Sequence, residues 1–328
     1  MDEYKHIRSF HTGPLLQITD WFTIVPGLEI LAKKTAKSVQ LDLNAPKTDL
    51  KNGALFISNH RDIVLDSGFL DLTLVNNGLS TVEIAIGDNL LIYPWIRTLV
   101  RLNRSFIVSR SGGIHDMLNN SRLLSGYIHY AVGEKQSSIW IAQREGRSKD
   151  SMDETQDSLL KMLTIAGEGS PKDKLRAINL TPLAISYEYD PCDYLKAAEM
   201  QLKRDNPDWH KSPEDDIRSM RTGIEGYKGR VVFHFTPSIN PWLDEQHEAL
   251  NAMTRQERLQ AIAHRIDWQI HSHYEVFDRG TDFETYLQER LQQIDLPNKD
   301  EAFLMDRLRE MYNNPVVNYE KSHLSGEF

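Results

Sequence analysis

The sequence has a single cysteine, Cys192, among its 328 residues. An internal disulfide needs two cysteines, and so does a zinc site built on thiolates, so both are excluded. One cysteine is compatible with a reducing cytoplasm. Cys192 stands in the run Asp-Pro-Cys-Asp, where two carboxylates raise rather than lower the pKa of a thiol. A nucleophilic role for Cys192 is therefore not favoured.

Long apolar runs are also missing. No stretch reaches the roughly 18 to 20 uninterrupted apolar residues that a membrane-spanning helix needs. The start, Met1 to His11, is charged and has no apolar core, so we expect no signal peptide. The stretch Leu15 to Ala32 is apolar with polar interruptions and precedes two lysines. It fits either a membrane-interface segment or an ordinary packing segment. We expect a cytoplasmic protein, peripherally associated with the cytoplasmic membrane.

An excess of positive charge is absent, because the net charge is −9 at pH 7. This excludes a typical nucleic-acid binder, which needs a basic surface against the phosphate backbone. The charge is unevenly distributed: residues 91–149 contain nine Arg or Lys and three acids, a local balance of +6 that leaves −15 for the rest. A cationic segment inside an acidic chain indicates a focused anion site.

Metal-ligand patterns are lacking too. His264, His271 and His273 fall in a helical stretch near the C-terminus, but no carboxylate stands at a metal-site spacing from them. We therefore expect no metal site.

Short β-rich apolar runs alternate with helix-length amphipathic segments between about residues 53 and 236. The expected strands are 54–58, 82–86, 106–109, 138–142, 183–187 and 230–235, and the expected helices between them are 63–75, 94–103, 114–131 and 154–166. This alternation predicts an α/β fold with a mostly parallel central sheet flanked by helices. Catalytic residues should then gather at one end of the strands.

The chain divides into three parts on this pattern. Residues 1–40 form an N-terminal helical segment, residues 41–240 an α/β domain with a polar insertion at about 193–228, and residues 241–328 a helical C-terminal extension with expected helices at 250–277, 281–294 and 301–312. We expect a helix and a surface loop in the insertion and assign it no chemistry.

Four segments carry the residues with chemical potential. The first, Ser58 to Ser67, places His60 at the end of an expected strand with Asp62 and Asp66 shortly after it. A histidine base oriented by a carboxylate can deprotonate a hydroxyl nucleophile. A histidine at a strand end, with Asp62 as the N-cap of the following helix, explains the same residues without catalysis.

The other three segments are an arginine-flanked strand, a Glu-Gly loop and a proline-bearing strand. Arg104 to Arg110 encloses an apolar strand with arginines that could clamp a phosphate. Glu145-Gly146-Arg147-Ser148-Lys149 follows another strand and offers donors to a phosphate, although a plain strand-to-helix loop has the same polarity. Leu180 to Glu188 indicates only a buried strand. The basic face of 94–103, with Arg97 and Arg101, could lie on an anionic bilayer or simply be solvated.

In this order the segments resemble the conserved blocks of the glycerolipid acyltransferase family, which includes glycerol-3-phosphate and 1-acylglycerol-3-phosphate acyltransferases. The family's Asn-His-Arg-Ser block with a downstream Asp is similar to Asn59-His60-Arg61 with Asp66, and its Glu-Gly-Thr-Arg-Ser block to Glu145-Gly146-Arg147-Ser148. Its Gly-x-x-Phe-Ile-x-Arg block is similar to Arg104–Arg110, with Arg104 in place of Gly. The family separates His and Asp by four residues, whereas five separate His60 from Asp66 and one separates it from Asp62. Either aspartate could therefore orient His60.

The resemblance implies an O-acyltransferase of phospholipid biosynthesis, in which His60 deprotonates the acceptor hydroxyl and Asp66 or Asp62 holds the imidazole. It implies that Arg110, Arg147 and Ser148 hold a phosphate, that Glu145 positions an arginine or the acceptor, and that the remaining block residues Asn59, Arg61, Arg104 and Gly146 contribute to substrate binding. The implied donor is acyl-CoA or acyl carrier protein, the acceptor is a lipid precursor at a membrane surface, and no cofactor is required.

Other functions remain open or are excluded by context. His60-Arg61-Asp62 matches the catalytic loop of protein kinases, but Ser67 stands where that loop needs Asn, and the N-terminal part is too short for a nucleotide-binding lobe. The acceptor could instead be a lyso-aminolipid. The chain could also be a non-catalytic lipid-binding relative, which the presence of both His60 and a nearby Asp disfavours.

Overall fold

The computed structural model describes residues 25–43, 52–87, 104–108 and 114–324. Within them a seven-stranded sheet has the order β1-β7-β6-β2-β5-β3-β4. The strands are β1 Ser38–Leu43, β2 Leu55–Ser58, β3 Glu83–Gly87, β4 Ser105–Val108, β5 Ile139–Ala142, β6 Leu180–Tyr187 and β7 Arg230–Phe235. Neighbouring strands run parallel except for β6 and β7. The predicted mostly parallel sheet is confirmed, and β1 is a strand that the sequence interpretation missed.

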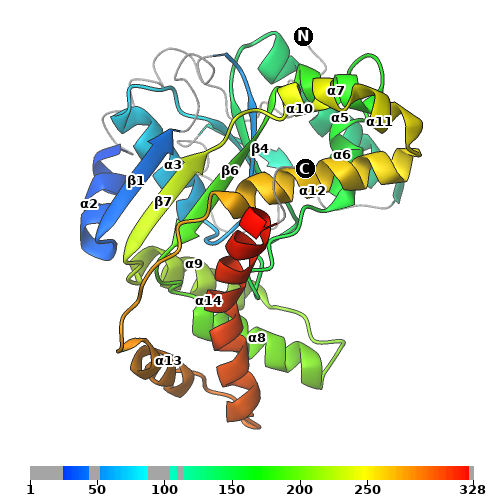
Figure 1. Ribbon diagram of the computed structural model, residues 1–328. Coiled ribbons are helices and arrows are strands. Elements are labelled where there is room, and N and C mark those ends of the chain that lie inside the picture. The colour runs from blue at the N-terminus through cyan, green and yellow to red at the C-terminus, as the bar shows by residue number, and fades with distance from the viewer. Residues whose placement is uncertain (1–24, 44–51, 88–103, 109–113, 325–328) are drawn as a thin grey trace.

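Helices flank the sheet on both faces (Figure 1). Those before the insertion are α2 Val25–Thr35, α3 Leu65–Asn76, α5 Ile114–Gly133, α6 Asp157–Leu163 and α7 Pro171–Ala177. Those from the insertion onward are α8 Asp193–Asp205, α9 Pro213–Glu225, α10 Asn240–Glu245, α11 His247–Ala252, α12 Arg255–Ser272, α13 Phe283–Gln292 and α14 Glu301–Leu324. The single long helix expected at 250–277 is divided, because Thr254 forms a capping box with Glu257 that starts α12 afresh. The helix expected at 94–103 lies outside the described residues.

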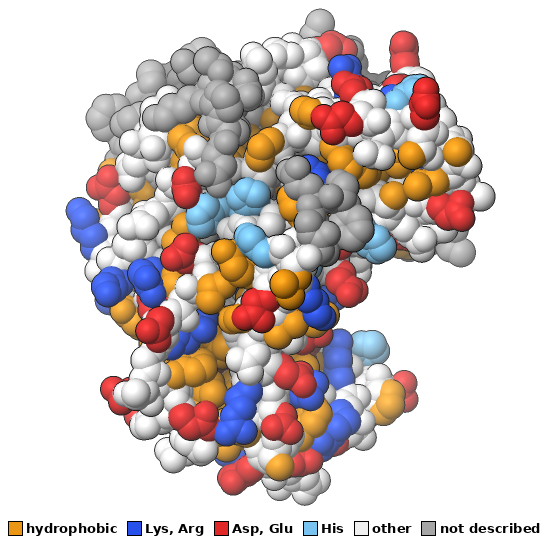
Figure 2. All heavy atoms as spheres, in the orientation of Figure 1, with side chains coloured by type: hydrophobic (Ala, Val, Ile, Leu, Met, Phe, Trp, Pro, Cys, Tyr) orange, Lys and Arg blue, Asp and Glu red, His pale blue; other side chains and the backbone are white. Residues whose placement is uncertain are grey.

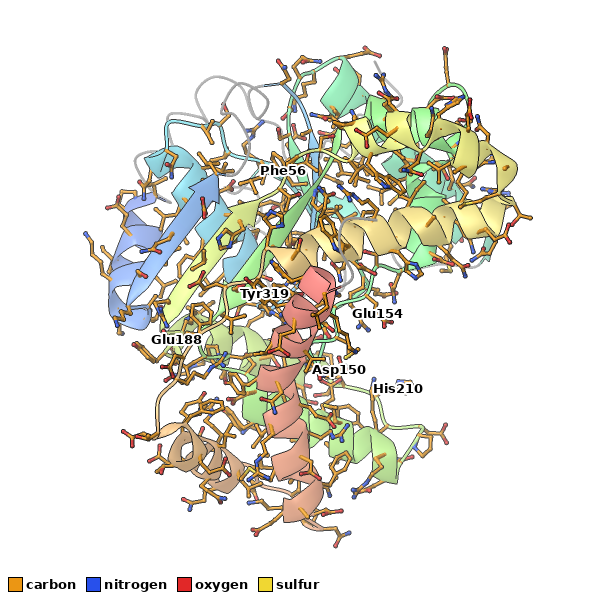
Figure 3. The ribbon with its side chains drawn as sticks, viewed as in Figure 1. Phe56, Asp150, Glu154, Glu188, His210 and Tyr319 are labelled. Carbon is orange, nitrogen blue, oxygen red and sulfur yellow. The ribbon has the colours of Figure 1, made fainter. Side chains whose placement is uncertain are left out.

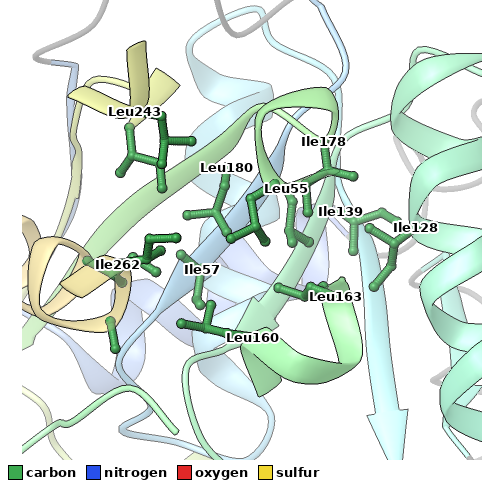
Figure 4. Packing of buried hydrophobic residues seen from close by; sticks show 14 of the residues in the cluster. Leu55, Ile57, Ile128, Ile139, Leu160, Leu163, Ile178, Leu180, Leu243 and Ile262 are labelled. Carbon is green, nitrogen blue, oxygen red and sulfur yellow. The ribbon is translucent and has the colours of Figure 1, made fainter. Parts of the chain in front are cut away.

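The central strands β2 and β6 are buried on both faces, as a parallel sheet covered twice by helices requires. Leu55 and Ile57 of β2 belong to a core shared with α5, α6 and α12 (Figure 4). Phe56, between them, points to the opposite face and packs in a second core with α2 and α3. This alternation follows from the two-residue period of a strand.

A lobe formed by α8, α13 and α14 extends below the sheet in the view of Figure 1. It has its own core, in which Ala197 of α8 packs with Leu287 of α13 and Leu304 of α14. The polar insertion is therefore packed against the last helices. The C-terminal extension contributes to two cores, because α12 packs on the sheet while α13 and α14 build the lobe. In the described part of the chain no helix is long and apolar enough to cross a bilayer.

Candidate active site

A cleft of about 580 Å³ lies at the carboxyl ends of β2 and β5. These strands pair in parallel from Leu55 with Ile139 to Ser58 with Ala142, so the segments that follow them leave the sheet at the same edge. Binding sites of open parallel sheets form at this edge. The surface is indented between the main body and the lobe (Figure 2).

The cleft has two walls that we name by their origin. The strand-end wall consists of residues that follow or end β2 and β5: His60, Ile63, Ser67, Trp140 to Ala142, Arg144 to Arg147 and Lys149. The lobe wall consists of Lys196 and Glu199 of α8 with Lys211 and Asp216. Residues of β3, α5 and α6 close the remaining side.

His60 is held by Asp66, which lies in the first turn of α3. Nδ1 of His60 is 2.8 Å from Oδ2 of Asp66, and the carboxylate is fully buried whereas the imidazole is 14% exposed. The ring also packs edge-on against Trp140, with 5.8 Å between centroids. An imidazole that donates through Nδ1 to a carboxylate presents Nε2 as its basic atom. The His60–Asp66 pair thus has the arrangement of a general base with its orienting acid.

Asp62 makes no such contact. Its Oδ1 accepts hydrogen bonds from the backbone N–H groups of Val64 (2.9 Å) and Leu65 (2.8 Å), so it holds the turn that leads into α3, whose N-cap position is Val64. Burial, and then the charge of Asp66, raise the pKa of Asp62. Of the two aspartates between which the sequence left a choice, Asp66 is the one in contact with His60.

The neighbours of His60 on both sides turn away from the cleft. Nδ2 of Asn59 donates to the carbonyl oxygen of Ile185 and Oδ1 accepts from its N–H, both at 2.8 Å, in a fully buried position. Arg61 forms an ion pair with Asp153, with 2.6 Å between Nη2 and Oδ2. These contacts hold the loop, and neither Asn59 nor Arg61 lines the cleft.

Arg104 lies at the wrong edge of the sheet for the cleft. It precedes β4, and the amino ends of parallel strands face away from the edge where His60 lies. Nη1 of Arg104 donates to the carbonyl oxygen of Thr81 (2.6 Å), and Nη2 donates to Oγ of Ser137 (3.0 Å). The expected contact of Arg104 with a phosphate in the cleft does not fit this position. Arg110 lies outside the described residues.

The Glu-Gly loop reaches the cleft with three of its four expected residues. Glu145, Gly146 and Arg147 line it, and the backbone N–H of Glu145 donates to Oε1 of Gln156 at 2.8 Å. Gly146 has φ +70°, a conformation that residues with a Cβ rarely adopt. Ser148 is fully buried, and its hydroxyl donates to Oδ1 of Asp150 at 2.8 Å. It therefore stabilises the loop from the side that faces the protein interior.

Arg147 of this loop lies near Asp62, Asp190 and Cys192. Burial acts to lower its pKa, but Cys192, Asp62 and Asp190 outweigh this and raise it. Burial raises the pKa of Cys192 to about 11, which keeps the thiol neutral near pH 7. Cys192 is therefore a neutral, buried residue that packs beside the charged guanidinium of Arg147.

The lobe wall was missed by the sequence interpretation. Lys149 of the strand-end wall pairs with Glu199 at 2.9 Å, and Lys211 pairs with Asp216 at 2.8 Å. Lys196 is buried and donates to Oδ2 of Asp190 at 2.5 Å. The signal in the sequence was the placement of Lys196 and Glu199 three residues apart, on one face of an amphipathic helix.

In the described ranges no three His, Cys, Asp or Glu side chains gather in a group that could hold a metal ion. No protein-family model matches the sequence. No curated protein matches it. Among solved structures, the chain is similar to the crystal structure of the 1-acyl-sn-glycerophosphate acyltransferase from Thermotoga maritima, with 9% identity and a TM-score of 0.36 over 77% of this chain and 95% of that one.

Proposed function

We propose that the protein is an O-acyltransferase that moves a fatty acyl group from an acyl thioester to a hydroxyl of glycerol-3-phosphate or 1-acylglycerol-3-phosphate in phospholipid biosynthesis. The observation that carries the proposal is the His60–Asp66 contact of 2.8 Å at a cleft that Arg147 also lines. The resemblance of the sequence segments to the glycerolipid acyltransferase blocks supports the choice of reaction.

His60 supplies the proton transfer that this reaction needs. Nε2 of His60 takes the proton of the acceptor hydroxyl as its oxygen forms a bond to the thioester carbonyl carbon. When the tetrahedral intermediate collapses, the carbon–sulfur bond breaks and the imidazolium returns the proton to the leaving thiolate. Asp66 stabilises the imidazolium between these two steps and fixes its tautomer. The products are an ester and a free thiol.

The charges of the cleft suit an anionic acceptor. Five cationic side chains line it, against three carboxylates: Arg144, Arg147, Lys149, Lys196 and Lys211 against Glu145, Glu199 and Asp216. Arginine binds phosphate through several directed N–H groups, and lysine adds charge. The same surplus of positive charge attracts the phosphates of acyl-CoA or an acidic acyl carrier protein. We keep both as donors, with the acceptor at the surface of the cytoplasmic membrane.

A lyso-aminolipid is the alternative acceptor that these observations favour next. The cleft presents carboxylates as well as cations, and Glu199 and Asp216 stand on the same wall as Lys196 and Lys211. An acceptor with both an ammonium and an acidic group would find partners of both signs there.

A screen of acceptors and donors with the purified protein tests the proposal. Glycerol-3-phosphate, 1-acylglycerol-3-phosphate and lyso-aminolipids are each offered labelled acyl-CoA and labelled acyl carrier protein. We expect ester formation with an anionic acceptor. A strong preference for an acceptor without an anionic group would overturn our assignment of the arginines, and binding of lysolipid without turnover with any pair would identify a non-catalytic lipid-binding protein.

A further inference from the structure

Residues 149–156 follow the Glu-Gly loop and are fastened by α12. Oδ1 of Asp267 accepts hydrogen bonds from the backbone N–H of Thr155 (2.9 Å) and from its hydroxyl (2.5 Å). One turn further along α12, Nε2 of His271 lies 3.0 Å from the carbonyl oxygen of Asp153. This side of the loop is thus held by side chains more than 100 positions away in the sequence.

The same segment is also fastened by α14. Nδ2 of Asn314 donates to the carbonyl oxygen of Asp150 at 2.7 Å, and Nδ2 of Asn318 donates to that of Met152 at 2.9 Å. Figure 3 shows Asp150 beside α14. Side chains that hydrogen-bond a loop backbone fix its path without becoming part of the cleft.

Asp153 connects this segment to the loop that carries His60. Its carboxylate is fully buried, and Oδ2 accepts the hydroxyl of Tyr274 (2.7 Å) and Nη2 of Arg61 (2.6 Å). The backbone of Asp153 has φ +53°, a strained conformation that persists only where the surroundings impose it. The contacts from α12, from Tyr274 just after it and from α14 are those surroundings.

Arg61 in turn contacts the catalytic pair through its backbone. Its N–H donates to Oδ2 of Asp66 at 2.6 Å. That is the same oxygen that lies 2.8 Å from Nδ1 of His60. A displacement of Arg61 therefore moves a hydrogen bond that helps to fix the orienting carboxylate.

We propose that the C-terminal extension positions the catalytic pair: Tyr274, which follows α12, and Asn314 and Asn318 of α14 fix residues 150–153, Asp153 fixes Arg61, and Arg61 fixes the carboxylate that orients His60. The inference rests on the proposed function of His60 as the base. Tyr274, Asn314 and Asn318 are positioning residues, because none of them lines the cleft. The C-terminal extension is on this account a supporting part of the active site.

Two variants test the chain of contacts without leaving a buried charge unpaired. Tyr274→Phe removes one hydroxyl donor from Asp153, and Asn314→Ala with Asn318→Ala removes two donors to the loop backbone. Asn313→Ala, on the exposed side of α14, is the matched control. Asp153→Asn is unsuitable, because it leaves the buried Arg61 guanidinium without its counter-charge and endangers folding.

Two measurements separate positioning from stability. The first is kcat and KM for acceptor and donor: we expect kcat to fall by roughly 3- to 30-fold in both test variants with KM unchanged, because small misplacements of a base reduce the rate and leave ground-state binding intact. The second is the downfield ring N–H resonance of His60, assigned by its loss in His60→Ala. We expect it to shift or broaden in both test variants and to stay in Asn313→Ala.

Each outcome bears on one claim. Folded test variants with wild-type kcat and an unchanged His60 resonance overturn the positioning role. A wild-type protein without acyl transfer overturns the proposed function instead, and the His60 resonance then decides the positioning role alone. A lower melting temperature in the test variants with unchanged kcat and resonance shows that α12 and α14 only stabilise the fold.

Discussion

The two walls of the cleft are built on different principles. In the strand-end wall the polar contacts are buried: Asp66 is fully enclosed, and the Arg61–Asp153 pair behind it is 7% and 0% exposed. In the lobe wall Lys196 is buried as well, but the Lys211–Asp216 ion pair is partly solvated, with 21% and 28% exposure. A buried pair is costly to break, whereas a solvated pair exchanges its partner at little cost. The buried contacts of the strand-end wall are therefore suited to a fixed geometry, and the Lys211–Asp216 pair of the lobe wall is suited to binding a charged ligand group.

The largest expected effect separates the two aspartates of the strand-end wall. Asp66→Asn removes the carboxylate that stabilises the imidazolium, so we expect kcat to fall by about 10²- to 10⁴-fold. Asp62→Asn keeps an acceptor for the N-terminus of α3 and should change the rate far less. Steady-state kinetics with both variants make the comparison. Equal losses in the two would contradict the assignment of Asp66 as the orienting acid.

A second effect concerns Asp267 of α12, which holds Thr155 in the segment that follows the strand-end wall. Burial raises the pKa of Asp267 to about 7, from an ordinary value of 3.8. A carboxyl group whose pKa is raised on folding binds more protons in the folded state, so its contribution to stability is lost as the pH rises between these two values, by at most about 1.4 kcal/mol per pH unit. Asp267→Asn should abolish this loss. Urea unfolding of both proteins between pH 5 and 8 measures it, and parallel pH curves would argue against the raised pKa.

A third effect lies where α9 packs against the loop that carries His60. Gly223 of α9 has no Cβ, and an added one would collide with Oδ2 of Asp62. We expect Gly223→Ala to lower the free energy of unfolding by roughly 1–3 kcal/mol, because overpacking moves Asp62 and the start of α3. Gly133→Ala, where an added Cβ meets nothing within 4 Å, is the control in thermal unfolding. Similar melting temperatures for the two variants would show that α9 can shift enough to accommodate the added Cβ without loss of stability, which would contradict the prediction.

The smallest effect is expected in the lobe wall itself. Lys211→Gln should raise KM for the anionic acceptor by about 3- to 10-fold and leave kcat near the wild-type value, because it removes a partly screened charge from the ground state and the transition state alike. Lys203→Gln, on α8 but outside the cleft lining, serves as the control. An unchanged KM in Lys211→Gln would remove this lysine from acceptor binding.

The sheet could be predicted from sequence because six of its strands are short apolar runs separated by helix-length segments. β1 was not predicted, because its apolar residues alternate with polar ones over only six positions and the strand is partly exposed to solvent. The His60–Asp66 contact could be proposed from sequence because both residues follow β2 and lie six positions apart. Choosing Asp66 rather than Asp62 as the partner of His60 required the structure, because the choice depends on the path of the chain into α3.

Two errors of the sequence interpretation have physical causes. Arg104 was expected at a phosphate site in the cleft, but it precedes β4 and so lies at the edge of the sheet that faces away from His60. The lobe wall was missed because it is brought to the cleft by contacts between residues far apart in the sequence. For example, Nζ of Lys196 donates to the carbonyl oxygen of Arg61, which lies 135 positions earlier in the chain. Local sequence patterns carry no information about such a contact.

The central claim is that His60 is the base of an acyl transfer. The most direct measurement is the rate of ester formation from a labelled acyl thioester and an anionic acceptor by wild-type protein and by His60→Ala, with His264→Ala, an exposed histidine of α12, as the control. The account predicts about 10²- to 10⁴-fold slower transfer in His60→Ala with the fold retained by circular dichroism, and wild-type rates in the control. Transfer at the wild-type rate by a folded His60→Ala protein would contradict it.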